Sequence, residues 1–174
     1  DLATHPKVLT SGDEAKFGLV PTQASEAVAL VDRDPHLRLR GVHLHVGSQA
    51  TDPELYWVLV ERLVEFVATH RTAFSVAPVL LDVGGGVASP YLRDDPVIEP
   101  AQVGAAMAKA LAEADAEGRI GSVELMLEPG RAVVANAGVL LYRVGVRKPL
   151  PSGGELLSLD GGMTDNPRPA LYGS

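Results

Sequence analysis

Apolar residues recur at intervals of three and four along two stretches of the chain, which is the spacing of one face of an α-helix. The first stretch follows Asp52 and Pro53, a capping aspartate and a first-turn proline. Its apolar positions include Leu55, Leu59, Leu63 and Val67. The second stretch ends at Gly118, and its apolar positions are Val103, Met107, Ala110, Leu111 and Ala114. Both patterns predict amphipathic helices, and the composition of QASEAVALVDR, residues 23–33, predicts a third.

Three short apolar runs predict buried strands between these helices. They are LRGVHLHV at 39–46, PVLLDVGGG at 78–86 and SVELMLE at 122–128. Strands and helices therefore alternate with a period of roughly forty residues, which is the size of a βα unit. Connections of this kind force a parallel sheet, either an open doubly wound sheet or a closed eight-stranded barrel.

The pattern changes after Arg131. Residues 132–148, AVVANAGVLLYRVGVRK, are rich in valine and predict one or two strands of a different, β-rich unit. We therefore expect two domains: a partial barrel over 1–131 and the start of a β-rich domain over 132–174. The stretch LDGGMTDNPRPALY, residues 159–172, has no apolar period and is interpreted as an ordered loop.

The length of the chain bears on the barrel hypothesis. An eight-stranded barrel takes about 250 residues, and this chain of 174 residues holds about four of its units. A barrel that lacked half its strands would expose two sheet edges. We therefore expect the sequence to be the central part of a longer polypeptide.

Composition and charge exclude some classes of partner. The formal net charge is -7 and the basic residues are scattered singly, so no nucleic-acid surface is expected. Neither a long apolar run nor a signal-peptide pattern is present, which predicts a cytoplasmic protein without a membrane span. The absence of cysteine excludes thiolate nucleophiles and cysteine-ligated zinc from this chain.

Three distinctive clusters follow the three predicted strands. They are HLHVGSQ at 43–49, the glycines at 84–86 and EPGR at 128–131. In a parallel βα sheet the ligand lies at the carboxyl ends of the strands. The coincidence of these three clusters is the main indication of a binding site.

The glycine run predicts a phosphate site, because three glycines let bare backbone amides point into one small space. Ser48 could add a hydroxyl and Arg131 a charged fork. The alternative is a tight βα turn without a ligand.

The two histidines of the first cluster alternate with apolar residues, so His43 and His45 face the same side of their strand. A metal site is one interpretation, but no third ligand is visible, and a buried histidine packed flat against an aromatic ligand or a neighbouring residue is the other. Glu128 could be a solvated strand end, but beside a phosphate pocket it needs a cationic partner, such as a protonated ring nitrogen. A phosphate cradle, a stacking histidine and a carboxylate for a ring nitrogen together describe a site for pyridoxal phosphate.

Four segments resemble, in order and almost letter for letter, the diaminopimelate decarboxylases of the alanine-racemase-like barrel group. They are HLHVGSQ, LDVGGG, LEPGRAVVANAG and DGGMTDNPRPALYG, and the opening THPKVLTSGDEAKFGL also resembles these enzymes. DNPRPALYG is more specific to this subfamily than GGG or EPGR, whose form related ornithine and arginine decarboxylases share. The resemblance implies an α/β fold, part of a (β/α)8 TIM-type barrel that binds pyridoxal phosphate, followed by the start of a β-rich C-terminal domain.

The resemblance also implies roles for individual residues. His45 would stack on the cofactor ring, and Glu128 would pair with the pyridine nitrogen and so make the ring a better electron sink. The other residues that would hold the cofactor are Ser48, Gly84, Gly85, Gly86, Pro129, Gly130 and Arg131. Arg131 would also contact the substrate, and Arg168 and Tyr172 would clamp a substrate carboxylate in a loop held rigid by prolines. No metal is expected.

No catalytic residue is expected within this chain. Enzymes of this kind hold the cofactor as a Schiff base with a lysine, which the family places on the first barrel strand, upstream of these residues. The lysines present are Lys7, Lys16, Lys109 and Lys148, and Lys16 is interpreted as structural. The family also uses a cysteine-containing segment of a partner subunit, which the chain lacks, and Val87 and Ala88 stand where the family usually has a further glycine.

The resemblance implies decarboxylation of meso-2,6-diaminopimelate to L-lysine by a homodimer with shared active sites, and inactivity of this fragment alone. Two alternatives stay open. One is a related decarboxylase that acts on another basic amino acid or a carboxylated polyamine. The other is a non-catalytic phosphate-binding barrel domain.

Overall fold

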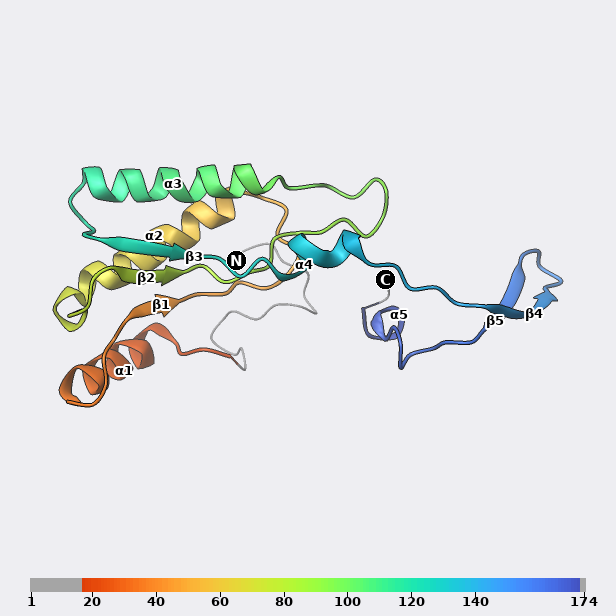
Figure 1. The fold of residues 1–174 in the computed structure, drawn as a ribbon, viewed down its shortest axis with the longest axis horizontal. Coiled ribbons are helices and arrows are strands. Elements are labelled where there is room, and N and C mark those ends of the chain that lie inside the picture. The colour runs from red at the N-terminus through yellow and green to blue at the C-terminus, as the bar shows by residue number, and fades with distance from the viewer. Residues whose placement is uncertain (1–16, 173–174) are drawn as a thin grey trace. The chain divides into compact units, whose positions relative to one another are not determined.

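The computed structural model describes residues 17–172, and for Pro169 and Tyr172 only the backbone. Lys7, Lys16 and most of the opening segment lie outside the described residues. The chain forms two compact units, Asp1–Ala135 and Asn136–Ser174, and each is described by itself. Figure 1 shows the elements of both.

The first unit is built on a three-stranded parallel sheet, as the alternation of strands and helices predicted. The strands are β1 (Gly41–His43), β2 (Val79–Asp82) and β3 (Val123–Met126), in the order β1-β2-β3. In the register of the sheet, His43 lies opposite Asp82, and Asp82 lies opposite Met126. The carboxyl ends of all three strands therefore meet at one edge.

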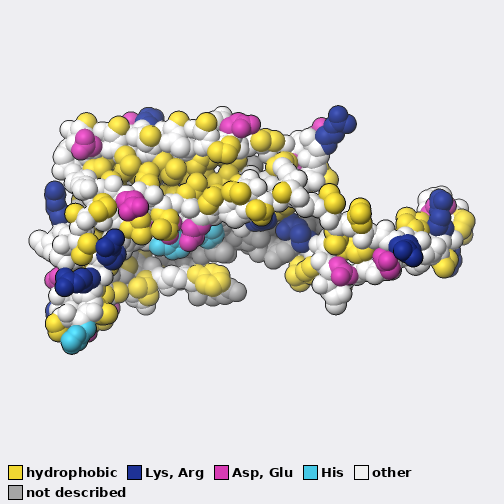
Figure 2. Space-filling view, in the orientation of Figure 1, with side chains coloured by type: hydrophobic (Ala, Val, Ile, Leu, Met, Phe, Trp, Pro, Cys, Tyr) yellow, Lys and Arg dark blue, Asp and Glu magenta, His cyan; other side chains and the backbone are white. Residues whose placement is uncertain are grey.

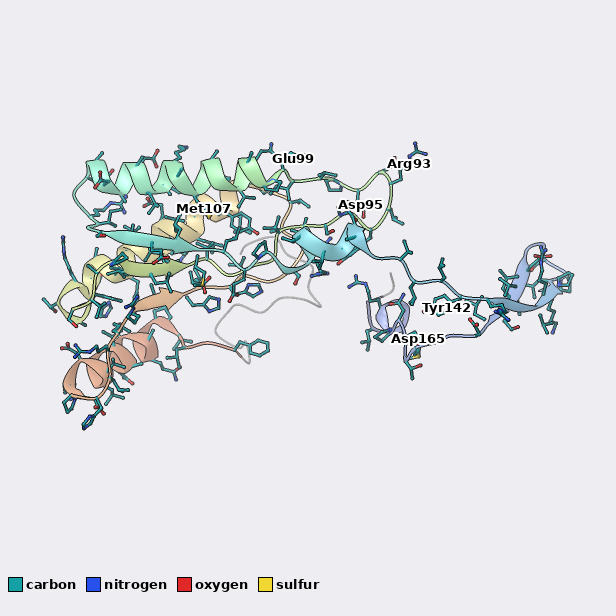
Figure 3. The ribbon with its side chains drawn as sticks, viewed as in Figure 1. Arg93, Asp95, Glu99, Met107, Tyr142 and Asp165 are labelled. Atoms are coloured by element: carbon teal, nitrogen blue, oxygen red, sulfur yellow. The ribbon has the colours of Figure 1, made fainter. Side chains whose placement is uncertain are left out.

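The three predicted helices are confirmed as α1 (Pro21–Arg33), α2 (Glu54–Thr69) and α3 (Pro100–Ala116). The Asp52 carboxylate accepts a hydrogen bond from the Glu54 amide at 3.0 Å, in line with its expected capping role. At the start of α3, Glu99 and Gln102 form a capping box, and Figure 3 shows Glu99 at this end of the helix.

The core lies where α2 and α3 pack against each other and the sheet (Figure 1). The predicted apolar faces supply it: Leu59 and Leu63 of α2 and Val103 of α3 are buried. Met107 is also buried and lies on the side of α3 that faces the rest of the unit (Figure 3). The Trp57 indole N–H donates to the Glu113 carboxylate at 2.8 Å and joins the two helices at their partly exposed margin.

The segment after Arg131 differs from the prediction. Residues 132–137 were expected to be extended but form helix α4 (Gly130–Val134) and the 3-10 turn η3 (Ala135–Ala137). The Val133 amide donates to the Pro129 carbonyl at 3.2 Å, so a helical turn takes up the backbone groups that follow the proline. The strand prediction holds for β4 (Val144–Pro149), which pairs in antiparallel fashion with β5 (Glu155–Leu159).

The stretch expected to be only a loop ends in a short helix, α5 (Arg168–Tyr172). Pro167 precedes its first turn and accepts a hydrogen bond from the Leu171 amide at 3.1 Å. The Asn166 side chain accepts one from the Arg168 amide at 3.3 Å and caps the turn. The segment around Arg168 is thus a capped helical turn, and its expected rigidity stays a prediction.

No helix within residues 17–172 is both long enough and apolar enough to cross a membrane.

Candidate active site

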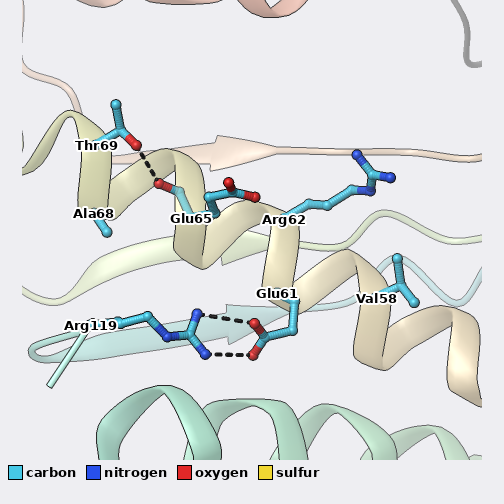
Figure 4. A pocket seen from close by; sticks show the side chains of 7 residues that line it. All are labelled: Val58, Glu61, Arg62, Glu65, Ala68, Thr69 and Arg119. Carbon is cyan, nitrogen blue, oxygen red and sulfur yellow. Dashed lines mark hydrogen bonds and ion pairs between the residues drawn. The ribbon is translucent and has the colours of Figure 1, made fainter. Parts of the chain in front are cut away.

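Among the hollows on the described surface of the first unit, two bear on the choice of a site. The larger, of about 620 Å³, lies on the outer side of α2 and is lined by Val58, Glu61, Arg62, Glu65, Ala68, Thr69 and Arg119 (Figure 4). Arg119 fills part of it with a two-pronged ion pair to Glu61, whose N–O distances are 3.0 and 3.1 Å. None of the motifs identified in the sequence lines this hollow, so its size does not make it the candidate site.

The smaller hollow, of about 280 Å³, lies at the carboxyl ends of the strands. Its lining is His45, Ser48, Gly85, Gly86, Val87, Glu128, Gly130 and Arg131. Seven of these eight residues were singled out from the sequence, and they come from all three strand ends. Of the predicted cofactor-binding residues, Gly84 and Pro129 are not part of the lining. We call this hollow the strand-end pocket.

The glycines of the strand-end pocket are required by close packing of backbone. A Cβ on Gly85 would lie 2.2 Å from the Glu128 carbonyl oxygen, and one on Gly86 would lie 2.0 Å from that of Gly47. Gly86 also has a φ of +87°, which side chains disfavour. The glycines thus allow the segments after β1, β2 and β3 to approach closely enough to form one pocket.

The backbone amides of these glycines differ from the expectation of three bare donors. The Gly84 amide donates to the Asp82 carboxylate at 2.9 Å, and the Gly85 amide donates to Nδ1 of His45 at 3.2 Å. Of the three glycine amides, that of Gly86 is the one without a hydrogen-bond partner among residues 17–172. Two of the three amides therefore hold the loop in shape, and one is available to a ligand.

The hydrogen bond from Gly85 fixes the state of the His45 ring. Because Nδ1 accepts a hydrogen bond from the Gly85 amide, a neutral His45 carries its own proton on Nε2. Burial lowers the pKa of His45 from 6.5, and the neighbouring His43 lowers it further, while Glu128 and Asp82 act in the opposite direction. The pocket thus presents a neutral, flat imidazole.

A second cluster joins His43, Asp82 and Glu128 at the ends of the strands. The His43 Nε2 lies 3.7 Å from a Glu128 carboxylate oxygen, and one atom of each residue lies within 4.8 Å of the others. Figure 2 shows histidine and acidic side chains gathered on the face in view. Asp82 is buried, whereas His43 and Glu128 are about half exposed. Sequence reasoning missed this grouping because its members are about forty residues apart, and the cluster supplies the carboxylates that HxH lacked.

Arg131 is held by a loop that follows β2. Its guanidinium donates to the Tyr91 hydroxyl and also lies 5.9 Å from the centre of the Tyr91 ring. The Asp95 carboxylate accepts the amides of Tyr91 and Leu92, at 2.7 and 2.9 Å. Hydrogen bonds from Leu92 and then Tyr91 lower the pKa of Asp95, so this carboxylate stays ionised and orders the loop (Figure 3).

Two further residues support the pocket, and the sequence analysis gave neither of them a role. The buried Tyr56 of α2 donates its hydroxyl to the Gly85 carbonyl at 3.2 Å. Gln49, which has a positive φ of 66°, bridges to the backbone of Ser89 through both atoms of its amide. In the sequence, a tyrosine on an apolar helix face looks like any core residue, whereas Gly47, two residues before Gln49, is a local sign of a turn.

The remaining predicted site residues belong to the second unit. Arg168 belongs to α5 in the second unit, as does Tyr172, whose side chain lies outside the described part. Of the described lysines, Lys109 of α3 lies 4.0 Å from Glu54 and 5.8 Å from the Trp57 ring, and Lys148 lies in β4. The expectation that the Schiff-base lysine lies outside this chain stays a prediction.

Comparison with known proteins identifies relatives over the whole chain. The family model described as "Pyridoxal-dependent decarboxylase, pyridoxal binding domain" matches residues 1–135. A diaminopimelate decarboxylase of Halalkalibacterium halodurans is 38% identical over 97% of this chain, and one of Actinosynnema pretiosum is 42% identical over 100%. The chain spans 39% of the length of each of these curated relatives.

Solved structures agree with the sequence matches. A diaminopimelate decarboxylase from M. jannaschii has a TM-score of 0.85 and 30% identity, covering 100% of this chain and 40% of its own. The Helicobacter pylori enzyme complexed with L-lysine has a TM-score of 0.83 and 26% identity, covering 100% and 41%. These matches confirm the predicted fold class and pyridoxal phosphate as the implied cofactor.

Proposed function

Because the chain belongs to the family of pyridoxal-binding domains of pyridoxal-dependent decarboxylases, we propose that it is the cofactor-binding part of a diaminopimelate decarboxylase. The whole protein removes one carboxyl group from meso-2,6-diaminopimelate and forms L-lysine. Relatives with this name, 38% and 42% identical over nearly the whole chain, support the choice of substrate.

One structural observation carries the cofactor part of this proposal. The strand-end pocket combines a flat neutral imidazole, a carboxylate, a guanidinium and an available glycine amide, all contributed by the ends of parallel strands. The imidazole matches the pyridine ring, the carboxylate matches the ring nitrogen, and the guanidinium and the amide match the phosphate of pyridoxal phosphate. The large hollow on α2 is lined by two carboxylates and two guanidinium groups but by no aromatic or imidazole ring. Its lining therefore offers no ring to stack on the pyridine of the cofactor.

The residues present fit the cofactor as follows. His45 stacks on the pyridine ring, and Glu128 pairs with the ring nitrogen. The Gly86 amide, the Ser48 hydroxyl and Arg131 bind the phosphate, while Gly84 and Gly85 shape the loop around it. Pro129 and Gly130 turn the chain between Glu128 and Arg131. When bound, pyridoxal phosphate accepts the electrons released as carbon dioxide leaves.

Substrate recognition is assigned to Arg131, Arg168 and Tyr172. A guanidinium matches a carboxylate through two parallel hydrogen bonds, and the capped turn at Arg168 restricts the backbone that carries it. A non-catalytic phosphate binder would have no use for a carboxylate clamp, which favours the decarboxylase over that alternative. A related decarboxylase with another basic substrate would keep the cofactor residues and differ in this clamp.

The proposal extends to the assembly. The barrel part includes residues 1–131, and the chain then passes through α4 and η3 into a β-rich domain that begins within residues 132–174. The lysine that binds the cofactor lies upstream of these residues, the active protein is a cytoplasmic homodimer, and this fragment alone does not turn over substrate.

The experiment that tests this function measures carbon dioxide released by the native protein with pyridoxal phosphate. Meso-diaminopimelate, ornithine and lysine are compared as substrates. We expect turnover of diaminopimelate alone. Turnover of ornithine or lysine instead would favour the related decarboxylase, and cofactor binding without release from any substrate would favour the non-catalytic domain.

A further inference from the structure

Two members of the cluster of His43, Asp82 and Glu128 have no role in the proposed binding of the cofactor. Glu128 is the carboxylate proposed for the ring nitrogen, but neither His43 nor Asp82 has been given a part. The three side chains come from the ends of β1, β2 and β3, so the cluster spans the sheet. Their nearest atoms lie within 4.8 Å of one another.

Two carboxylates so close repel each other when both are ionised. Asp82 is only 9% exposed, and its carboxylate is anchored by the Gly84 amide at 2.9 Å, so it cannot swing away without disturbing the glycine loop. Glu128 is about half exposed. Repulsion from Asp82 would therefore displace the Glu128 side chain toward solvent, away from the ring nitrogen it is proposed to meet.

His43 is placed to oppose that displacement. Its Nε2 lies 3.7 Å from a Glu128 carboxylate oxygen, which is longer than a hydrogen bond and close enough for an ion pair when the imidazole is protonated. Nδ1 of His45 cannot hold Glu128 in this way, because it already accepts a hydrogen bond from the Gly85 amide. The titratable groups that face His43 among the described residues are His45, Asp82 and Glu128.

We propose that His43 is a positioning residue, which holds the Glu128 carboxylate at the ring-nitrogen position and offsets the repulsion between Glu128 and Asp82. The inference rests on the proposed function, because it gives His43 its role through the cofactor's ring nitrogen. His43 itself does not contact the reacting atoms.

The test compares two ligands on the native protein. One is pyridoxal 5′-phosphate, and the other is its 1-deaza analogue, in which a C–H group replaces the ring nitrogen. Dissociation constants are measured by absorbance titration for the parent protein, His43→Gln, the permanently charged His43→Arg, and His36→Gln as a control on an exposed loop. Thermal unfolding identifies the variants that fold, and His43→Asn replaces His43→Gln if the latter does not.

We expect His43→Gln to weaken binding of pyridoxal phosphate about two- to fivefold, the size typical of an exposed ion pair, and to leave binding of the analogue unchanged. His43→Arg should restore the difference between the dissociation constants of the two ligands, and His36→Gln should change neither dissociation constant. Equal weakening for both ligands would overturn the inference in favour of a general structural role, and no weakening for either would overturn it too. Failure of the parent protein to bind pyridoxal phosphate would contradict the proposed function itself.

Discussion

The backbone amide of Gly85 donates a hydrogen bond to Nδ1 of His45 across 3.2 Å, and so ties the glycine loop after β2 to the segment after β1. This contact has two consequences. It selects the tautomer of the histidine proposed to stack on the cofactor, and it uses an amide that three consecutive glycines would otherwise offer to a phosphate. The shape of the pocket and the protonation of its imidazole are therefore coupled.

The first prediction concerns the pH dependence of stability. Burial, and then His43, lower the pKa of His45 in the folded chain below its ordinary 6.5. The unfolded chain regains the ordinary value and binds more protons as pH falls below about 6.5, so folding stability falls in that range until the folded-state pKa is reached. We expect the parent to lose more stability than His45→Gln between about pH 7 and pH 5.

Urea unfolding at the two pH values measures this difference. His36→Gln is the control and should lose as much as the parent, because His36 lies exposed before β1. Equal losses for the parent and His45→Gln would show that His45 is not held neutral by its surroundings.

The second prediction concerns close packing at the glycine loop. Gly85→Ala places a methyl group 2.2 Å from the Glu128 carbonyl oxygen, so backbone must move. We expect a loss of about 1–3 kcal/mol in the free energy of unfolding, together with weaker binding of pyridoxal phosphate. Gly104→Ala on α3 is the matched control, since its new methyl group meets nothing within 4 Å. This substitution should raise the free energy of unfolding by about 0.5–1 kcal/mol. A Gly85→Ala protein as stable as the parent would argue against the packing described.

Much of this pocket could be predicted from the sequence, for a physical reason. The βα repeat forces parallel strands, and parallel strands bring residues at 43–49, 84–86 and 128–131 to one edge without any knowledge of side-chain contacts. The helices followed from apolar spacing and from capping by Asp52.

The rest of the site could not be predicted, because it depends on contacts between residues that are far apart in the sequence. Nothing local shows that the amide of Gly85 finds an acceptor forty residues earlier, or that Glu128 lies beside His43. The short helices α4 and α5 were missed because five residues are too few to display a helical period, and the valines of α4 favour strand on propensity alone.

The third prediction concerns Tyr56, whose hydroxyl donates to the Gly85 carbonyl from a fully buried position. Burial raises the pKa of Tyr56 to about 12, so it is a neutral donor at ordinary pH. Tyr56→Phe leaves this carbonyl without its side-chain donor, and we expect unfolding to become easier by about 1–3 kcal/mol.

Thr69→Val is the control for Tyr56→Phe, because it removes a side-chain hydrogen bond to a backbone carbonyl at an exposed position of the same helix. It should change the free energy of unfolding by no more than about 0.5 kcal/mol. Similar values for the two variants, measured by urea unfolding, would mean that the Tyr56 hydroxyl adds nothing to the support of the glycine loop.

The fourth prediction concerns the substrate clamp. Arg168→Ala removes a guanidinium proposed to bind the substrate carboxylate, so we expect the KM for meso-diaminopimelate to rise about 10- to 100-fold while cofactor affinity stays the same. Arg147→Ala, which removes an exposed arginine paired with Glu155 in the same unit, should leave both unchanged. Loss of cofactor affinity in Arg168→Ala would contradict the assignment of this arginine to the substrate.

The central claim is that the strand-end pocket, and not the larger hollow on α2, binds pyridoxal phosphate. A crystal structure of the native protein grown with pyridoxal 5′-phosphate tests it most directly. We expect the phosphate beside Ser48 and Gly86, the ring against His45, and the ring nitrogen beside Glu128. A cofactor phosphate bound beside Arg62 and Arg119, or a strand-end pocket without the cofactor at saturating concentration, would contradict it.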